Sequence, residues 1–532
     1  MSIPRWLTVL LIVLLTAPGL ATAQEGDSAE ALLEQLAEAS PRDTETAIKA
    51  IATSGHERAR DWLDAYGNNR LSQVKDTGQI VVVLNNRGRD WEVADALTGE
   101  NLGEMSRRDL DRIAVNNAIR RQLEGVMAMM DLYANDVGVR EAAALDLMGK
   151  VDGAIVGDVT ARIEEEPDAD IRSRLELAVA IYQVEEQGSA EAISVLAGSL
   201  HPRARAALNN AVASEDPALR PAAEQALGSI EQKLKLNKAA ETLYFGLSLG
   251  SVLVLAAIGL AITFGVMGVI NMAHGELIML GAYTTWGMQQ LLPGQPGLAL
   301  ILSIPAGFLV AALAGIAIER SVIQFLKGRP LETLLATFGI SLILQQLVRT
   351  VISPQNRTVV SPEWMSGSLV INDALSLTLN RMYVLGFALV VFAALMLIMR
   401  RTRLGLEVRA VTQNRAMARS MGIRATRVDI MTFALGSGVA GLAGVALSQL
   451  TNVGPNLGQN YIIDSFMVVV FGGVGNLWGT LVAGLTLGTI NQLLEPWAGA
   501  VLAKIIVLVF IILFIQKRPK GLFPQKGRAA EA

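Results

Sequence analysis

The segment Gly265–Tyr283, GVMGVINMAHGELIMLGAY, is the part of the sequence that decides the fold. Continued to Leu291, it is apolar and long enough to cross a membrane as a helix, yet it contains Asn271, His274 and Glu276. Ionisable groups at bilayer depth are costly and usually face a bundle interior or a water-filled path. The segment therefore predicts a membrane protein with a polar route. Taken alone, the same residues fit equally well with polar contacts that hold neighbouring helices together.

The polar and small residues of this segment also predict a local irregularity. Asn271 and His274 are three residues apart and would share one face of a helix, whereas nearby glycines would support a break in it. Irregular backbone at membrane depth is tolerated only where protein buries it or where it lines a wet cavity. His274 and Glu276 could also pair with each other. The candidate substrate-pathway residues are Asn271, His274, Glu276, Thr284 and Asn476.

Apolar segments recur from Thr242 onward, and they predict an all-α, polytopic membrane helical bundle. Several have about the 20 residues that a spanning helix needs. We expect about nine segments, with eight or ten also compatible, because two short ones on either side of Gly479 could form one broken element. The segments lie at 242–264, 265–291, 298–318, 332–352, 383–400, 428–449, 462–477, 479–494 and 499–516.

The distribution of basic residues predicts the orientation of this bundle. The loop 400–427 carries eight arginines and one acid, and the tail that follows the last segment is also basic, so both are expected in the cytoplasm. Residues 1–23 are expected to be a signal peptide, with an apolar run and small residues at the cleavage site Ala21–Ala23. An exported start and a cytoplasmic end require an odd number of crossings, which agrees with nine.

Residues 24–240 have a different composition, with 38 acidic and 24 basic side chains and with Ala, Leu, Glu and Arg at helical spacing. Two stretches, DADIRSRLELA and DPALRPAAEQALG, share an acid, a turn, an arginine and an apolar face, which suggests an irregular helical repeat of the HEAT type. The β-branched run in Gln79–Val93 predicts a small β-hairpin. We expect a mostly α-helical periplasmic domain at 24–240, a transmembrane domain at 241–518 and a cytoplasmic tail at 519–532.

The sequence gives no indication of catalysis by the chain itself. It has no cysteine, and His56 and His201 lack the paired spacing of metal ligands. A Walker A motif is also absent from the sequence, so the chain would not hydrolyse ATP. Gly436–Gly441 matches GxGxxG, but it lies inside an apolar segment, where small residues favour close helix packing. No catalytic residue, metal, cofactor or nucleic-acid partner is therefore expected.

The cytoplasmic loop contains RAMARSMGIRATRVD, Arg415–Asp429, which predicts a short amphipathic helix that ends at Gly422 and a basic turn after it. Such a helix at the membrane face could dock a partner protein, or it could serve only to fix topology and bind anionic headgroups. The regular alternation of small and basic residues favours docking. The candidate coupling residues are Arg415, Ala416, Ala418, Arg419, Gly422 and Arg424.

Four motifs, in this order, resemble the branched-chain amino acid type of ABC-importer permease. They are GVMGVINMAHGELIMLGAY, RAVTQNRAMARSMGIRATRVDIMTFALGSGVAGLAG, FMVVVFGGVGNLWGTLVAG and QKRPKGLFP, and the resemblance covers about residues 242–524. Within that family, ALSQLTNVGPNLGQNYIIDSFMVVVFGGVGNLWGT and the long exported region look like the urea-transporter permease subunit. The loop lacks the Glu-Ala-Ala form known in other importer classes, which leaves the docking residues open.

The resemblance implies a subunit of a larger bacterial inner-membrane importer. A second, related permease subunit, two cytoplasmic ATP-binding subunits and a periplasmic substrate-binding protein would be its partners, with the lipid bilayer around it. The family's coupling segment maps onto residues 415–427, and the expected substrate is urea or a similarly small neutral amide. A branched-chain amino acid permease is one alternative, and an ATP-independent channel or secondary transporter is another. In a third, the exported domain acts as a sensor or scaffold.

Overall fold

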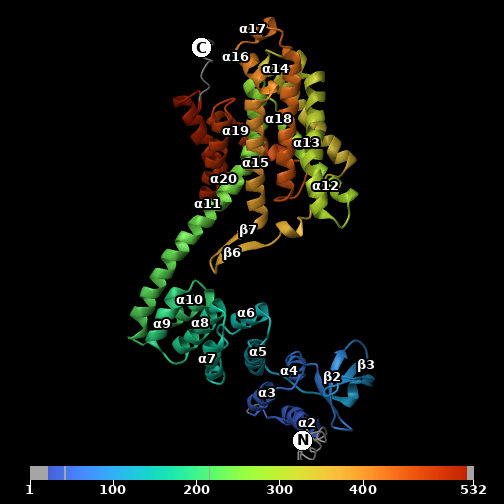
Figure 1. Cartoon of the computed structure of the whole chain (residues 1–532), viewed down its shortest axis with the longest axis vertical. Coiled ribbons are helices and arrows are strands. Elements are labelled where there is room, and N and C mark those ends of the chain that lie inside the picture. Colours follow the sequence, from blue (N-terminus) through green and yellow to red (C-terminus); the bar gives the residue numbers. More distant parts are fainter. Residues whose placement is uncertain (1–21, 41–42, 215, 524–532) are drawn as a thin grey trace, which may run out of the picture. The chain divides into compact units, whose positions relative to one another are not determined.

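The computed structural model describes residues 22–40, 43–214 and 216–523. The chain divides into two compact units, Met1–Lys233 and Leu234–Ala532, and the division falls within the long helix α11 (Leu219–Met267). Almost all of the expected signal peptide at 1–23 lies outside the described residues, as does the end of the expected tail. Figure 1 labels the helices and strands of both units.

The first unit is mostly helical, as the sequence predicted. Its helix N-termini explain the two similar acid-containing stretches. Asp168 accepts hydrogen bonds from the backbone N–H groups of Asp170 and Ile171, and Asp216 accepts one from that of Ala218. Helices α6, α7, α9 and α10 all pack against α8. The helices are α2 (Thr22–Glu38), α3 (Thr44–Thr53), α4 (Ala59–Gly67), α5 (Asn117–Asp131), α6 (Val137–Asp146), α7 (Val156–Glu165), α8 (Ala169–Glu185), α9 (Ala190–Gly198) and α10 (Pro202–Ala213).

A five-stranded antiparallel sheet interrupts these helices, with strand order β4-β3-β2-β1-β5. The predicted hairpin is confirmed as β2 and β3, in which Val83 pairs with Val93. The other three strands were missed because they lack a β-branched run. One face buries Val81, Val83, Trp91, Val93 and Leu110. The elements are β1 (Leu71–Val74), β2 (Ile80–Asn85), β3 (Asp90–Asp95), β4 (Asn101–Ser106), the 3-10 turn η1 (Arg107–Asp109) and β5 (Leu110–Arg112).

A buried carboxylate joins two of the helices in this unit. The Glu166 side chain is 0% exposed; its Oε2 lies 2.6 Å from Arg162 Nη2, and its Oε1 lies 3.3 Å from Arg140 Nη2. Both arginine side chains are 10% exposed. A buried charge is tolerated only when it is paired, so Glu166 is required to compensate two cations between α6 and α7.

We expect Glu166→Leu to destabilise this region by about 3 to 5 kcal/mol, because two buried guanidinium groups lose their partner. Hydrogen exchange of α6–α8 in the full chain measures this loss as a lower opening free energy. The matched control is Glu165→Leu, since Glu165 is exposed, and it should change the opening free energy by less than about 0.5 kcal/mol. Equal protection in both variants would contradict the assigned role.

The second unit is the membrane bundle, and its all-α character is confirmed. Among the described residues, six helices are long and apolar enough to cross a membrane: α11, α13 together with η2, α14, α15, α18 and α20. Helices α12 and α19 are shorter or less apolar. The helices after α11 are α12 (His274–Leu291), α13 (Pro296–Ser321), α14 (Pro330–Val351), α15 (Leu379–Arg401), α16 (Arg403–Gln413), α17 (Arg415–Ser420), α18 (Ala425–Ser448), α19 (Leu457–Gly472) and α20 (Leu477–Lys517). The shorter elements are η2 (Ile323–Phe325), η3 (Glu363–Met365), β6 (Ser368–Asn372) and β7 (Leu375–Thr378).

The nine predicted apolar segments do not correspond one to one with these helices, because six candidate spans are found in the described ranges. The two segments on either side of Gly479 lie on two separate helices, α19 and α20, rather than on one broken element. The last two segments share α20, which is 41 residues long and is interrupted at Gly499, where φ is 76°. Because that backbone conformation favours glycine and Pro496 lies three residues before it, the interruption follows from the local sequence. The segment 265–291 instead spans the end of α11 and all of α12.

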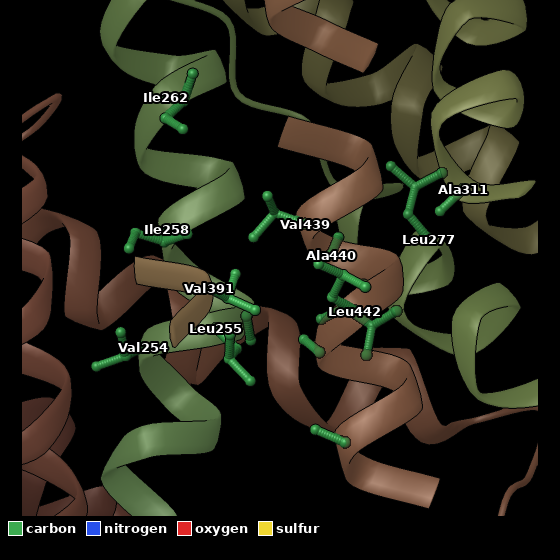
Figure 2. Close-up of a cluster of buried hydrophobic side chains, with 14 of the residues drawn as sticks. Val254, Leu255, Ile258, Ile262, Leu277, Ala311, Val391, Val439, Ala440 and Leu442 are labelled. Atoms are coloured by element: carbon green, nitrogen blue, oxygen red, sulfur yellow. The ribbon is translucent and has the colours of Figure 1, made fainter. Parts of the chain in front are cut away.

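Helix α18 lies at the centre of the bundle and packs closely against α12 and α13. Figure 2 shows part of the core, with Val439, Ala440 and Leu442 of α18 near Leu277 of α12 and Ala311 of α13. In Figure 1, the loop that carries α16 and α17 lies at the end of this bundle opposite β6 and β7. One end of the membrane unit therefore carries α16 and α17, and the other carries β6 and β7.

The glycines of α18 confirm the predicted packing role of the GxGxxG match. A Cβ added at Gly441 would overlap the carbonyl oxygen of Gly307 in α13, and one at Gly444 would overlap that of Ile278 in α12. Helix backbones can approach this closely only where side chains are absent. The motif thus lets α18 pack closely against α12 and α13.

Candidate permeation and coupling site

The predicted break at the start of the deciding segment is present. Helix α11 ends at Met267, Gly268 has φ of 66°, and α12 begins at His274. Asn271 therefore lies outside the helix, and the prediction that it shares a helical face with His274 is wrong. Its Oδ1 instead accepts a hydrogen bond from the backbone N–H of Ala273 at 3.0 Å. The left-handed backbone at Gly268 ends α11 before Asn271 is reached.

The polar groups of this segment are buried within the bundle rather than exposed on its surface. Asn271 is 1% exposed, His274 0% and Glu276 1%. His274 Nε2 lies 2.9 Å from the carbonyl oxygen of Ala256 in α11. His274 thus ties α12 to α11.

Glu276 does not pair with His274 but binds two side chains of α14. Its Oε1 accepts hydrogen bonds from Ser341 Oγ at 2.9 Å and from Gln345 Nε2 at 2.7 Å. The backbone N–H of Met272 also donates to Thr337 Oγ1 at 3.1 Å, so the break itself contacts α14. Sequence reasoning missed both partners of Glu276, although Ser341 and Gln345 are polar residues four apart within an apolar segment.

The remaining two pathway candidates make local contacts. Thr284 is half-buried, and its Oγ1 donates to the carbonyl oxygen of Leu280 at 2.8 Å, one turn earlier in α12. Asn476 precedes α20: its Oδ1 accepts from the backbone N–H of Gly479, and its Nδ2 donates to the carbonyl oxygen of Phe523 at 3.1 Å. Asn476 therefore holds the turn between α19 and α20.

The same turn also binds residues of the expected tail. The backbone N–H of Leu522 donates to the carbonyl oxygen of Phe471 at 2.9 Å, and that of Phe523 donates to the carbonyl oxygen of Gly472 at 3.1 Å. The described part of the tail thus folds back onto the end of α19.

A cavity of about 550 Å³, lined by both polar and apolar side chains, lies between α11, α19 and α20. Its walls carry four asparagines, together with Thr451, Tyr461 and an apolar patch from α11 and the start of α19. Asp464 Oδ2 and Lys504 Nζ meet in it at 2.8 Å. The lining residues are Leu249, Leu253, Asn356, Thr451, Asn452, Leu457, Asn460, Tyr461, Asp464, Asn491, Glu495, Ala500, Ala503 and Lys504.

None of the cavity residues was predicted as part of the site, although a signal existed. Asp464 and Lys504 each stand as a charge inside an apolar segment, and an intramembrane charge marks a functional position by default. Asn491 is 8% exposed, and within the part of the chain that the structure describes its Oδ1 has no hydrogen-bond partner. The cavity therefore offers an unused buried acceptor.

The predicted amphipathic helix of the loop is confirmed as α17. Asn414 Oδ1 accepts from the backbone N–H of Met417 at its start, and Gly422, with φ of 86°, follows its end. Ala418 is buried in an apolar cluster that also contains Val411 and Val428, whereas Ala416 is exposed. Helix α17 thus presents one face to the bundle and one to solvent.

A basic hollow of about 690 Å³ adjoins α17. Arg320, Arg419, Arg424 and Arg427 line it, and none of them forms an ion pair with any residue in the described ranges. Arg415 instead binds Asp429 of α18. The loop therefore combines a free basic surface with one fixed arginine.

The bundle of apolar helices, its interrupted segments and its cavity are the features of a multi-pass membrane permease. Residues 242–515 match the family described as branched-chain amino acid transport system / permease component, and the chain belongs to that family. The first unit lies outside this match.

Individual relatives agree with the family. The high-affinity branched-chain amino acid transport permease LivH of Salmonella typhimurium is 28% identical over 292 residues, which is 53% of this chain and 94% of the relative. BraD of Pseudomonas aeruginosa, a permease of the same description, is 29% identical over 52% of this chain and 93% of its own length. The ribose import permease RbsC of Escherichia coli is 28% identical over 229 residues, which is 40% of this chain and 70% of the relative. No solved structure matches the chain.

Proposed function

We propose that the chain is the permease subunit of an ATP-driven importer for urea or a similarly small neutral amide. The observation that carries the substrate class is the set of polar side chains that line the cavity. Its one lysine is already paired with Asp464, so within the described ranges the cavity lining holds no unpaired cation for a carboxylate. Four asparagine side chains there offer both donors and acceptors, as a neutral amide requires.

The hydrogen-bonding groups of the cavity also match those of urea. Urea presents N–H donors on two sides and one carbonyl acceptor. Asn491 Oδ1 is a buried acceptor without a partner in the described ranges, and Glu495 adds a carboxylate that forms no ion pair there. An unmade hydrogen bond at a buried acceptor is costly, so a donor-rich solute would be favoured.

Branched-chain amino acids are the second candidate, and two observations favour them. The relatives LivH and BraD are described as permeases for these amino acids. The cavity also carries an apolar patch of Leu249, Leu253 and Leu457 that suits an aliphatic side chain. In this alternative, Lys504 and Asp464 would separate to bind the carboxylate and the ammonium group.

The surrounding assembly follows from the ABC-importer class. A second related permease, two cytoplasmic ATP-binding subunits and a periplasmic binding protein are the partners, in a bacterial inner membrane. The loop with α16 and α17 would face the cytoplasm, because it carries most of the arginines, and residues 24–240 would face the periplasm. The exposed face of segment 415–427 would then contact the ATP-binding subunits. The buried groups Asn271, His274 and Glu276 would lie along the route of the solute.

Uptake by the purified complex in proteoliposomes tests the proposal. With ATP inside, we expect radiolabelled urea to accumulate and an excess of leucine not to compete. Accumulation of leucine without that of urea would establish the amino acid alternative. Urea entry at the same rate without ATP or without the ATP-binding subunits would establish a passive channel or a secondary transporter instead.

The cavity itself is tested by Asn491→Leu. Loss of one hydrogen bond of about 1.4 kcal/mol to the solute should raise the KM for urea about tenfold. Gln492→Leu is the matched control, because Gln492 neighbours Asn491 in α20 but does not line the cavity, and its KM should stay within about twofold. Equal KM values in the two variants would remove the cavity from the pathway.

A further inference from the structure

Four charged side chains meet at the end of the bundle that carries α17, and we call them the charge node. They are Glu319 of α13, Lys327 in the connection to α14, Arg415 of α17 and Asp429 of α18. Lys327 Nζ lies 3.0 Å from Glu319 Oε1 and 2.9 Å from Asp429 Oδ2. Arg415 Nη2 donates to the other oxygen of the same aspartate, Oδ1. The node therefore joins four separate elements of the membrane unit.

The two carboxylates of the node are buried and the two cations are not. The side chain of Glu319 is 0% exposed and that of Asp429 1%, against 25% for Lys327 and 34% for Arg415. Removing a buried carboxylate from water is costly unless a cation compensates it. Asp429 uses one oxygen for each cation, so it is the residue at which the two halves of the node are connected.

The position of Asp429 connects α17 to the start of α18. It lies in the first turns of α18, the helix whose glycines pack against α12 and α13. A movement of α17 that leaves α18 in place would break the Arg415–Asp429 pair and leave a buried charge with one partner fewer. A movement that keeps the pair must carry the start of α18 with it.

We propose that Asp429 is a positioning residue for transport, and that its pair with Arg415 passes movement of α17 to α18 and, through Lys327, to Glu319 of α13. The inference rests on the proposed function, in which segment 415–427 contacts the ATP-binding subunits. Arg415 thus acts through Asp429 rather than on the solute. Loss of the Arg415 side chain should allow ATP hydrolysis to continue while solute uptake falls.

The test compares three arginine variants in the purified complex in proteoliposomes. Arg415→Ala should lower the amount of solute taken up per ATP hydrolysed at least about tenfold, the effect of losing one charged hydrogen bond of about 1.5 kcal/mol. Arg415→Lys keeps the charge and should restore the ratio to within about threefold. Arg403→Ala is the matched control, because Arg403 is an exposed arginine of α16 outside segment 415–427, and its ratio should not change.

A merely structural role would give a different pattern. Uptake and hydrolysis would then fall together with the melting temperature, and their ratio would stay constant, which would overturn the proposal. Failure of Arg415→Lys to restore the ratio would overturn it as well. Where Arg415→Ala yields no folded complex, Asp429→Asn serves instead, because it keeps the shape of the side chain and removes its charge. We expect the same fall in solute taken up per ATP hydrolysed. An unchanged ratio in this variant would overturn the proposal.

The measurement also keeps this inference apart from the proposed function. The ratio is measured with whichever solute the wild-type complex accumulates, so transport of leucine in place of urea corrects the substrate and leaves the test of Asp429 intact. Uptake without ATP in the wild type defeats the proposed function and, with it, the inference. An ATP-driven wild type with an unchanged ratio in Arg415→Ala defeats the inference alone.

Discussion

Replacing Gly444 with valine should destabilise the membrane unit strongly. Even a single Cβ at this position would overlap the carbonyl oxygen of Ile278, which belongs to the backbone of α12 and cannot rotate away. Helices α12 and α18 would have to separate, and with them the core around Leu277 and Val439 shown in Figure 2. Overpacking of this kind costs about 3 kcal/mol or more.

The melting temperature of the purified chain in detergent measures this effect, and we expect a fall of about 6 to 12 °C. Gly339→Val in α14 is the matched control, because a Cβ at Gly339 would meet no atom within 4 Å. Its melting temperature should stay within about 2 °C. Equal falls for the two variants would show that the α12–α18 approach is not the limiting contact.

Glu276→Ala should lower uptake of the solute about 100-fold. Two hydrogen bonds to a carboxylate, from Ser341 and Gln345, are lost, and together they are worth about 3 kcal/mol. Glu276→Gln keeps an acceptor oxygen toward both donors and should stay within about tenfold of the wild type. Gln346→Ala is the matched control, because Gln346 is exposed on α14 beside Gln345 and should leave uptake unchanged.

Two readouts separate the pathway role of Glu276 from a role in holding helices together. A pathway residue changes the KM for the solute in Glu276→Gln, with little change in melting temperature. A residue that only joins α12 to α14 lowers the melting temperature and leaves KM unaltered. The second pattern would contradict the placement of Glu276 along the route.

The course of the membrane helices was predictable because the bilayer leaves the backbone few choices. A spanning segment must satisfy its hydrogen bonds internally, so each long apolar run becomes a helix. The hairpin at Gln79–Val93 was predictable for a similar local reason, since β-branched residues flank a clear turn. Local sequence also predicted that α17 ends just before Gly422.

The partners within the site were not predictable, because they come from distant parts of the chain. Glu276 binds residues that lie 65 and 69 positions later, and nothing in its own segment indicates which helix will face it. Asp464 of α19 and Lys504, which follows the interruption of α20 at Gly499, are 40 positions apart. The position of Asn271 was predicted wrongly because the helical spacing of the segment suggested a continuous helix, whereas the left-handed backbone at Gly268 ends α11.

The bonds that residues Leu522 and Phe523 make with the turn after α19 have a consequence for biosynthesis. A nascent chain emerges from the ribosome N-terminus first, so the earlier helices can insert and pack while these last contacts are still missing. The turn between α19 and α20 acquires its final hydrogen bonds only after translation of the preceding bundle is complete. A premature stop codon shortly before the codon for Leu522 would therefore yield a permease that lacks these hydrogen bonds at the end of α19.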